Sequence, residues 1–169
     1  MTVVSYFYDT EGTLYRAAAM RLQEDCARLG LKIHIQERLD FGKTWIELCR
    51  AKPVFILEMC RRFRGPILFV DADCRLKSIP DIDSKKTWGF LPNAEDESLK
   101  VYDHAHYCDG SEEAMAFCRK WQTAINILGG GSHSALKHVI TEVDYFLLSN
   151  NDFEIGITDT KSKQEYFRS

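Results

Sequence analysis

Hydrophobic and polar residues follow one another along the chain in patterns that predict strands and helices in turn. Residues 2–8 are β-branched and aromatic, and residues 31–36 alternate between apolar and polar, so both stretches predict strands. Residues 14–29 lie between them and have apolar side chains at helical spacing, with Gly30 placed to end the helix. Strands that alternate with helices favour an α/β fold, with a mostly parallel central sheet flanked by helices.

The rest of the chain continues this pattern less regularly. Residues 45–50 and 53–63 predict two short helices, because Pro53 suits a first helical turn. Residues 66–70 are continuously apolar, as in a buried strand. Farther along we expect strands at 88–91, 99–106 and 153–157, and helices at 112–128 and 134–143. Because no repeat, low-complexity segment or linker divides the chain, we expect a single domain over residues 1–169.

Composition and charge narrow the range of functions. The chain has 22 basic and 25 acidic residues and a net charge of −3, without the basic excess typical of nucleic-acid binders. It has no apolar run near the ~18 residues that predict a membrane span, and its first residues do not resemble a signal peptide. None of the six cysteines forms a CxxC pair. We therefore expect a cytoplasmic protein with reduced cysteines and no membrane span.

Two carboxylates follow the apolar strand predicted at residues 66–70. Asp71 and Asp73 flank a single alanine at the strand's carboxyl end, which is where open α/β sheets bind ligands. Carboxylate oxygens are ligands that Mg²⁺ and Mn²⁺ prefer, and phosphates commonly complete the shell. Such a metal neutralises charge on a departing diphosphate. A solvated Asp-x-Asp turn is the alternative.

Several motifs taken together resemble a known family. After the first strand come Tyr15, Ala18, Leu22, Cys26, Leu29 and Gly30, then Trp45, Lys52, Pro53, Phe55 and Ile56, then Asp71-Ala72-Asp73, then Trp121 and the segment Ser132 to Leu136. This pattern resembles the small glycosyltransferases of the GT-A, nucleotide-diphospho-sugar transferase type, many of them from phages and bacteria. The likeness covers residues 3–80 well and 88–145 loosely.

The resemblance implies a metal-dependent hexosyl- or pentosyltransferase with a Rossmann-like sheet. Residues from 1 to about 85 would form the nucleotide-binding half and residues from about 86 to 169 the acceptor-side half. The implied contacts to the nucleotide sugar, expected to be a UDP-sugar, are Tyr8, Asp9, Thr10, Lys52 and Asp71. Asp71 and Asp73 would hold Mn²⁺ or Mg²⁺. The acceptor is not implied, although phage relatives make modified DNA one candidate.

The chain departs from the family pattern at the segment that begins with Ser132. Relatives often carry an acid there, near the sugar, whereas this chain has Ser132 followed by His133. Relatives also often supply a third metal ligand, commonly a histidine, from a longer C-terminal part. Ser132 and His133 are therefore the catalytic candidates, and His133, placed after a glycine run on an expected mobile loop, could also be that ligand or contact the sugar.

His104 and His106 alternate on one face of the strand predicted at residues 99–106. A same-face pair could bind a metal, but two ligands are too few for a zinc site. Surface polar residues are the favoured interpretation.

Two other functions remain open. The segment from Asp9 to Leu14 resembles the nucleophile turn of haloacid-dehalogenase-type phosphatases, in which Asp9 would attack phosphate. Against this, Glu11 is one methylene longer than the expected acid, and no later double-aspartate segment is present. Alternatively, a domain that lacks the family's acid could bind a nucleotide sugar without transferring it.

Overall fold

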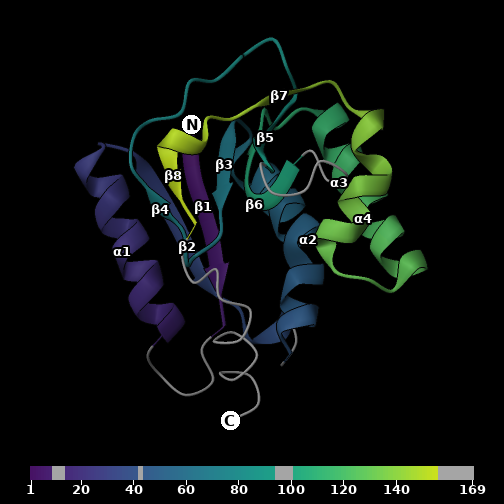
Figure 1. Ribbon diagram of the computed structural model, residues 1–169, viewed down its shortest axis with the longest axis horizontal. Helices are drawn as coiled ribbons and strands as arrows, with labels where there is room; N and C mark the ends of the chain where they lie inside the picture. Colours follow the sequence, from purple (N-terminus) through teal and green to yellow (C-terminus); the bar gives the residue numbers. More distant parts are fainter. Residues whose placement is uncertain (9–13, 42–43, 94–100, 156–169) are drawn as a thin grey trace.

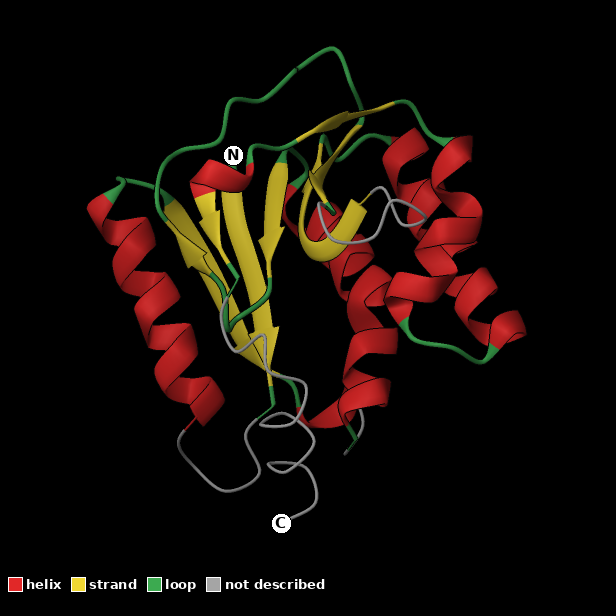
Figure 2. Cartoon of the chain, in the orientation of Figure 1, coloured by secondary structure: helices red, strands yellow, loops and turns green. Residues whose placement is uncertain are grey.

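The computed structural model describes residues 1–8, 14–41, 44–93 and 101–155, which form an α/β fold (Figures 1 and 2). The strands are β1 (Thr2–Phe7), β2 (Lys32–Glu37), β3 (Ile67–Val70), β4 (Arg75–Leu76), β5 (Trp88–Pro92), β6 (Val101–Cys108), β7 (Tyr145–Leu147) and β8 (Phe153–Glu154). The helices are α1 (Leu14–Arg28), α2 (Trp45–Phe63), α3 (Glu112–Leu128) and α4 (Ser132–Val139), with short 3-10 turns at Leu39–Phe41, Ile140–Glu142 and Asn150–Asp152.

Six strands form the central sheet in the order β2-β1-β3-β6-β5-β7. The pairings of β1 with β2, β1 with β3 and β5 with β7 are parallel, and the two pairings of β6 are antiparallel. β4 and β8 form a separate antiparallel pair. The mostly parallel sheet expected from the sequence is therefore confirmed, with β6 as an antiparallel strand in its middle.

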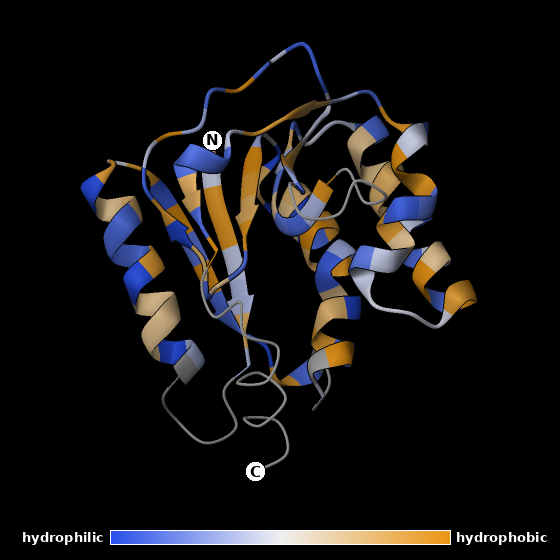
Figure 3. Ribbon diagram, in the orientation of Figure 1, coloured by the Kyte–Doolittle hydropathy of each residue, from blue (hydrophilic) through white to orange (hydrophobic). Residues whose placement is uncertain are grey.

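Helices cover both faces of the sheet (Figure 1). α1 packs on one face, where Leu22 and Cys26 meet Val3 and Leu68 of the strands. α2, α3 and α4 pack on the other face around a larger core that includes Phe55 and Trp121. Hydrophobic residues run along the middle strands, while α1 mixes hydrophilic and hydrophobic residues, as expected for a helix with one buried face (Figure 3). No helix in the described ranges is long and apolar enough to cross a membrane.

One long helix, α2, replaces the two short helices predicted at 45–50 and 53–63, so that prediction was wrong. Thr44 caps its first turn by accepting from the Glu47 backbone N–H, while the Glu47 side chain reaches back to the Thr44 backbone N–H. Pro53 lies inside the helix, where its missing N–H removes one helical hydrogen bond without ending the helix. Lys52 therefore lies in the middle of α2 rather than between two helices.

The second half of the chain also differs in detail from the prediction. α4 begins at Ser132, two residues before the predicted start, because Gly131 takes the extended backbone of an N-cap. The strands β4 and β7 were not predicted, since two and three residues are too few for a clear alternation. Of the strand expected at 153–157, Phe153–Glu154 is present as β8, and residues beyond 155 lie outside the described part.

β6 contains an irregularity that shapes the site. Its register against β5 jumps from the pair Phe90–His106 to the pair Leu91–Tyr102. Such a bulge re-aims side chains. Asp103 and His106 consequently both reach the helices on the same face of the sheet, although residues three apart point to opposite faces of a regular strand.

The expectation that His104 and His106 are surface polar residues is wrong for His106. This side chain is completely buried against the rings of Phe69, Phe90 and Trp121. Burial, followed by the nearby Lys52 cation, lowers the pKa of His106 to about 3. His106 is therefore a neutral core residue.

Candidate functional site

A pocket opens at the carboxyl ends of β1 and β3, the place where ligands bind in open α/β sheets. Its lining residues are Tyr6, Phe7, Tyr8, Tyr15, Leu48, Cys49, Lys52, Asp71, Ala72 and Asp73. The structure thus brings together four of the six residues predicted to hold the donor and the metal: Tyr8, Lys52, Asp71 and Asp73. The other two of these six, Asp9 and Thr10, lie outside the described residues.

Backbone hydrogen bonds hold the two aspartates at the end of β3. The Asp71 N–H donates to the His104 carbonyl at 2.8 Å, which ties the strand end to β6. The Cys74 N–H donates back to the Asp71 carbonyl at 2.9 Å and closes a turn around Asp73. Asp73 is buried at 8% exposure. Because both carboxylates come from one tight turn, they line the same pocket.

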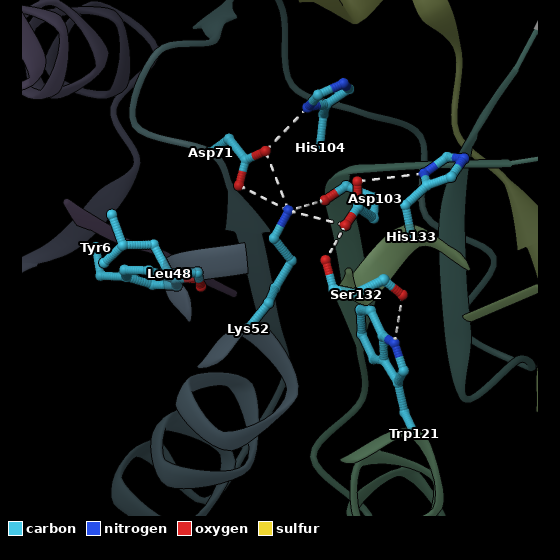
Figure 4. Close-up of polar contacts among 9 residues, drawn as sticks. All are labelled: Tyr6, Leu48, Lys52, Asp71, Asp103, His104, Trp121, Ser132 and His133. Atoms are coloured by element: carbon cyan, nitrogen blue, oxygen red, sulfur yellow. Dashed lines mark hydrogen bonds and ion pairs between the residues drawn. The ribbon is translucent and has the colours of Figure 1, made fainter. Parts of the chain in front are cut away.

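Lys52 crosses from α2 to lie between two carboxylates (Figure 4). Its Nζ is 3.0 Å from Asp71 Oδ1 and 3.3 Å from Asp103 Oδ2, and it also donates to the Asp103 backbone carbonyl. The side chain is only 4% exposed. Burial alone would lower the pKa of Lys52, but the charges of Asp103 and Asp71 outweigh it and raise that pKa well above its usual value. Lys52 is therefore a buried ammonium ion whose positive charge is balanced by the two carboxylates.

A histidine lies at each end of this arrangement. His104 Nδ1 is 2.9 Å from Asp71 Oδ2, and His133 Nδ1 is 3.3 Å from Asp103 Oδ1. We call the series His104, Asp71, Lys52, Asp103 and His133 the ionic chain. Burial alone would lower the pKa of His104, but the hydrogen bond from the ring to Asp71 raises it above its usual value.

Both carboxylates of the ionic chain are held in the ionised form. Burial would raise the pKa of Asp71 and of Asp103, yet the Lys52 ammonium lowers both, and neighbouring histidines add to the effect. For Asp103 the pKa falls well below the ordinary value. The Ser132 hydroxyl also donates to Asp103 Oδ2.

The first turn of α4 and the loop before it are held in place by the neighbouring helices. Trp121 Nε1 of α3 donates to the Ser132 carbonyl at 2.8 Å. Arg50 of α2 donates to the carbonyls of Gly130, at 2.9 Å, and of Gly129. His133 was expected on a mobile loop, and the structure instead places it in this anchored helical turn.

Asp103 was not among the residues singled out from the sequence. Its carboxylate accepts from Ser132 and His133, at the segment where the resembled family often has an acid. One signal was available: Asp103 falls between Val101 and Ala105 in an alternating strand, so it occupies an inward position that normally holds an apolar residue. The bulge that turns it toward Lys52 has no clear sequence signature.

The residues present fit a divalent cation only together with a ligand. No cluster of three or more His, Cys, Asp or Glu within the described ranges could hold a metal by itself. Asp71 and Asp73 nevertheless offer carboxylate oxygens to one pocket. Mg²⁺ commonly uses one or two carboxylates, with substrate phosphates and waters completing its shell. The donor set is thus suitable for a cation that arrives with a diphosphate.

Comparison with known proteins gives a result for structure and none for sequence. No protein-family model matches the chain, and no curated protein matches its sequence.

Solved structures share its fold. A glycosyltransferase involved in the glycosylation of the major capsid of PBCV-1 superposes with a TM-score of 0.75 at 12% identity, covering 99% of this chain and 98% of that one. The glycosyltransferase GlyE of Streptococcus pneumoniae TIGR4 superposes with a TM-score of 0.59 at 13% identity, covering 88% of this chain but 46% of GlyE. At these identities the likeness establishes the fold that this chain shares with both structures.

Proposed function

We propose that this protein is a metal-dependent glycosyltransferase that moves a hexosyl or pentosyl group from a nucleoside-diphosphate sugar to an acceptor. One observation carries the proposal. Asp71 and Asp73 line a single pocket with Tyr8 and Lys52, at the strand ends of a chain with the glycosyltransferase fold. We also propose that it works in the cytoplasm.

The pocket's chemistry supports a donor with a planar base and a diphosphate. Phe7, Tyr8 and Tyr15 give one wall an aromatic character suited to a nucleobase, which we take to be uracil. The diphosphate would lie toward Asp71 and Asp73, the residues that would hold Mn²⁺ or Mg²⁺. When bound, the cation neutralises charge on the departing diphosphate.

Lys52 would act mainly by balancing charge inside the protein. A direct contact between its ammonium and the diphosphate stays a prediction, because the ammonium already binds Asp71 and Asp103. Lys52 would keep the carboxylates of Asp71 and Asp103 ionised and in place. It would thereby orient Asp71, a candidate metal ligand, without touching the metal.

Two classes of acceptor are candidates. Sugar chains are one, because the PBCV-1 neighbour is involved in glycosylation of a capsid. Modified DNA is the other, because of the phage-type resemblance. The division into a nucleotide half and an acceptor half stays a prediction.

The first test is a thermal-shift screen of nucleoside diphosphates and nucleotide sugars, with and without Mn²⁺. We expect one nucleotide to raise Tm only when Mn²⁺ is present. A ligand at ~100 times its Kd stabilises by about 2.7 kcal/mol, which corresponds to roughly 5–10 °C for a chain of this size. Asp73→Asn keeps the side chain's shape but removes its charge, so it should abolish the Mn²⁺-dependent shift while leaving the Tm of the free protein nearly unchanged.

The outcome of this screen can contradict the proposal in two ways. If no nucleotide raises Tm, the nucleotide-binding assignment fails. If Asp73→Asn keeps the full Mn²⁺-dependent shift, the metal assignment fails even though the nucleotide binds.

The binding-only alternative depended on the acid that the α4 segment lacks. Asp103 favours the transferase interpretation instead. Its ionised carboxylate accepts a hydrogen bond from Ser132, so an acid is present beside that segment. Mn²⁺-dependent nucleotide-sugar binding with no turnover of any donor would favour the binding-only function.

A further inference from the structure

His133 ends the ionic chain on the side away from the donor pocket. The described residues that line the pocket include Lys52 and Asp71 but not His133. Its imidazole is 30% exposed, and the ring nitrogen that does not face Asp103 points away from the ionic chain (Figure 4). A nucleophile outside the donor pocket could therefore reach this nitrogen.

The contact with Asp103 selects one tautomer of the neutral imidazole. An ionised carboxylate only accepts hydrogen bonds, so the Nδ1 that faces Asp103 Oδ1 must carry a proton. When the ring is neutral, its Nε2 is then the unprotonated nitrogen. The geometry gives the tautomer that a general base needs, as in an Asp–His pair of a hydrolase triad.

Asp103 is suited to orient this histidine but not to act as the base itself. Its two oxygens accept from Ser132 and His133 and form an ion pair with Lys52. It is 7% exposed. A buried carboxylate that three side chains already engage is a poor proton acceptor, whereas it stabilises a neighbouring imidazolium.

The two histidines of the ionic chain differ in their place relative to the donor. His104 pairs with Asp71, a candidate metal ligand in the donor pocket. His133 pairs with Asp103 and sits in the anchored first turn of α4. Trp121 holds the turn that carries the base, and Arg50 holds the loop before it, which together meet the need for a rigid site.

We propose that His133 is the general base of the transfer, with Asp103 as its positioning residue; this inference rests on the proposed function. His133 Nε2 takes the proton from the acceptor hydroxyl as the hydroxyl oxygen bonds to the sugar's anomeric carbon. The bond from that carbon to the diphosphate breaks, and the nucleoside diphosphate leaves with the electron pair. Because the protein supplies a base for direct attack, the transfer inverts the anomeric configuration.

The test uses donor hydrolysis, in which water takes the acceptor's place. The probe is the nucleotide sugar that gives the largest Mn²⁺-dependent thermal shift, and proton NMR reads the configuration of the freshly released sugar. We expect inversion in the wild-type protein. His133→Gln should lower kcat by about 100-fold or more, the usual contribution of a general base, with the donor KM and the nucleoside-diphosphate Kd unchanged.

Two further variants test the positioning role of Asp103 and the specificity of the His133 effect. Asp103→Asn should lower kcat and leave KM unchanged, because the amide can favour the wrong tautomer. His138→Gln changes an exposed histidine on the same helix and should hydrolyse the donor at the wild-type rate.

Two results would overturn the inference while leaving the proposed function standing. They are retention of configuration and an unchanged kcat in His133→Gln. Wild-type donor binding without any hydrolysis would favour the binding-only function and remove the general base with it. Absence of nucleotide binding by the wild-type protein would instead remove the proposed function, and the general base with it.

Discussion

At the scale of single residues, Lys52 links the two sides of the site, because it pairs with Asp71 on one side and with Asp103 on the other. Its ammonium is buried and separates the carboxylates of Asp71 and Asp103. Desolvating an ammonium is costly, and the two carboxylates offset that cost only while all three groups are present. Its Nζ also lies 5.4 Å from the centre of the Phe69 ring. Removing the lysine would leave two anions facing each other in the interior.

We therefore predict that Lys52→Met lowers the free energy of unfolding by about 3–5 kcal/mol, the usual cost of breaking a buried pair. Methionine fills similar space, so the loss would come from charge rather than from a cavity. Urea denaturation measures it. The double variant Lys52→Met, Asp103→Asn should recover part of the loss, because one of the two unpaired anions is gone. Equal stability of Lys52→Met and wild type would show that the ionic chain contributes nothing to folding.

His106 gives a prediction for the dependence of stability on pH. Its pKa is about 3 in the folded protein against 6.5 as the ordinary value, so the unfolded chain binds the proton first as pH falls. Its contribution is fully present above pH 6.5 and is lost between 6.5 and 3, at about 1.4 kcal/mol per pH unit. His106→Phe should remove this slope. Urea denaturation of both proteins between about pH 7 and about pH 4 compares them, and parallel curves would contradict the assignment.

Sequence reasoning located one half of the site and missed the other for a physical reason. Asp71 and Asp73 could be placed because a strand's end follows directly from the end of its apolar run. Tyr8 and Lys52 joined them through a family pattern. Asp103 depends on a bulge in β6, which is set by tertiary pairing with β5 and has no local signature.

At the scale of elements, α2 stays one helix although Pro53 lies inside it, because its capped first turn and its buried face stabilise it. The reciprocal hydrogen bonds between Thr44 and Glu47 satisfy N–H groups of the first turn, and Phe55, Ile56 and Met59 bury the helix against the sheet. These contributions exceed the one hydrogen bond that Pro53 removes. The proline was a clearer sequence signal than the capping box, which explains the wrong division into two helices.

The capping box should be measurable through Thr44→Ala. We expect the free energy of unfolding to fall by about 1 kcal/mol, because alanine leaves the Glu47 N–H without its acceptor. Urea denaturation measures this loss, and far-UV circular dichroism shows whether the later turns of α2, which carry Lys52, stay formed. A variant as stable as wild type would mean that the cap does not stabilise this helix.

At the scale of the whole molecule, β6 connects the donor pocket at the end of β3 with the first turn of α4. It pairs with β3, whose end carries Asp71, and it supplies Asp103, which contacts the first turn of α4. The α/β fold could be predicted because alternating strands and helices leave few topologies, and its solved neighbours share it. The antiparallel insertion of β6 could not, because strand direction is decided by long-range pairing. Fold likeness alone does not identify the chemistry, so the competing activities must be separated by which aspartate is essential.

The last prediction separates glycosyl transfer from the phosphatase alternative by comparing Asp9 with Asp73. In a transferase Asp9 would lie near the nucleoside and attack nothing, so Asp9→Asn should weaken nucleotide binding moderately and spare donor hydrolysis, while Asp73→Asn abolishes it. In a phosphatase Asp9 would form the acyl phosphate, which an amide cannot do. Mg²⁺-dependent phosphate release from an aryl phosphate, measured beside nucleotide-sugar hydrolysis, distinguishes them. We expect no phosphate release from the wild-type protein. Strong aryl-phosphatase activity that is lost in Asp9→Asn and kept in Asp73→Asn would reverse the functional conclusion, because the metal and the nucleophile would then lie elsewhere than at the end of β3.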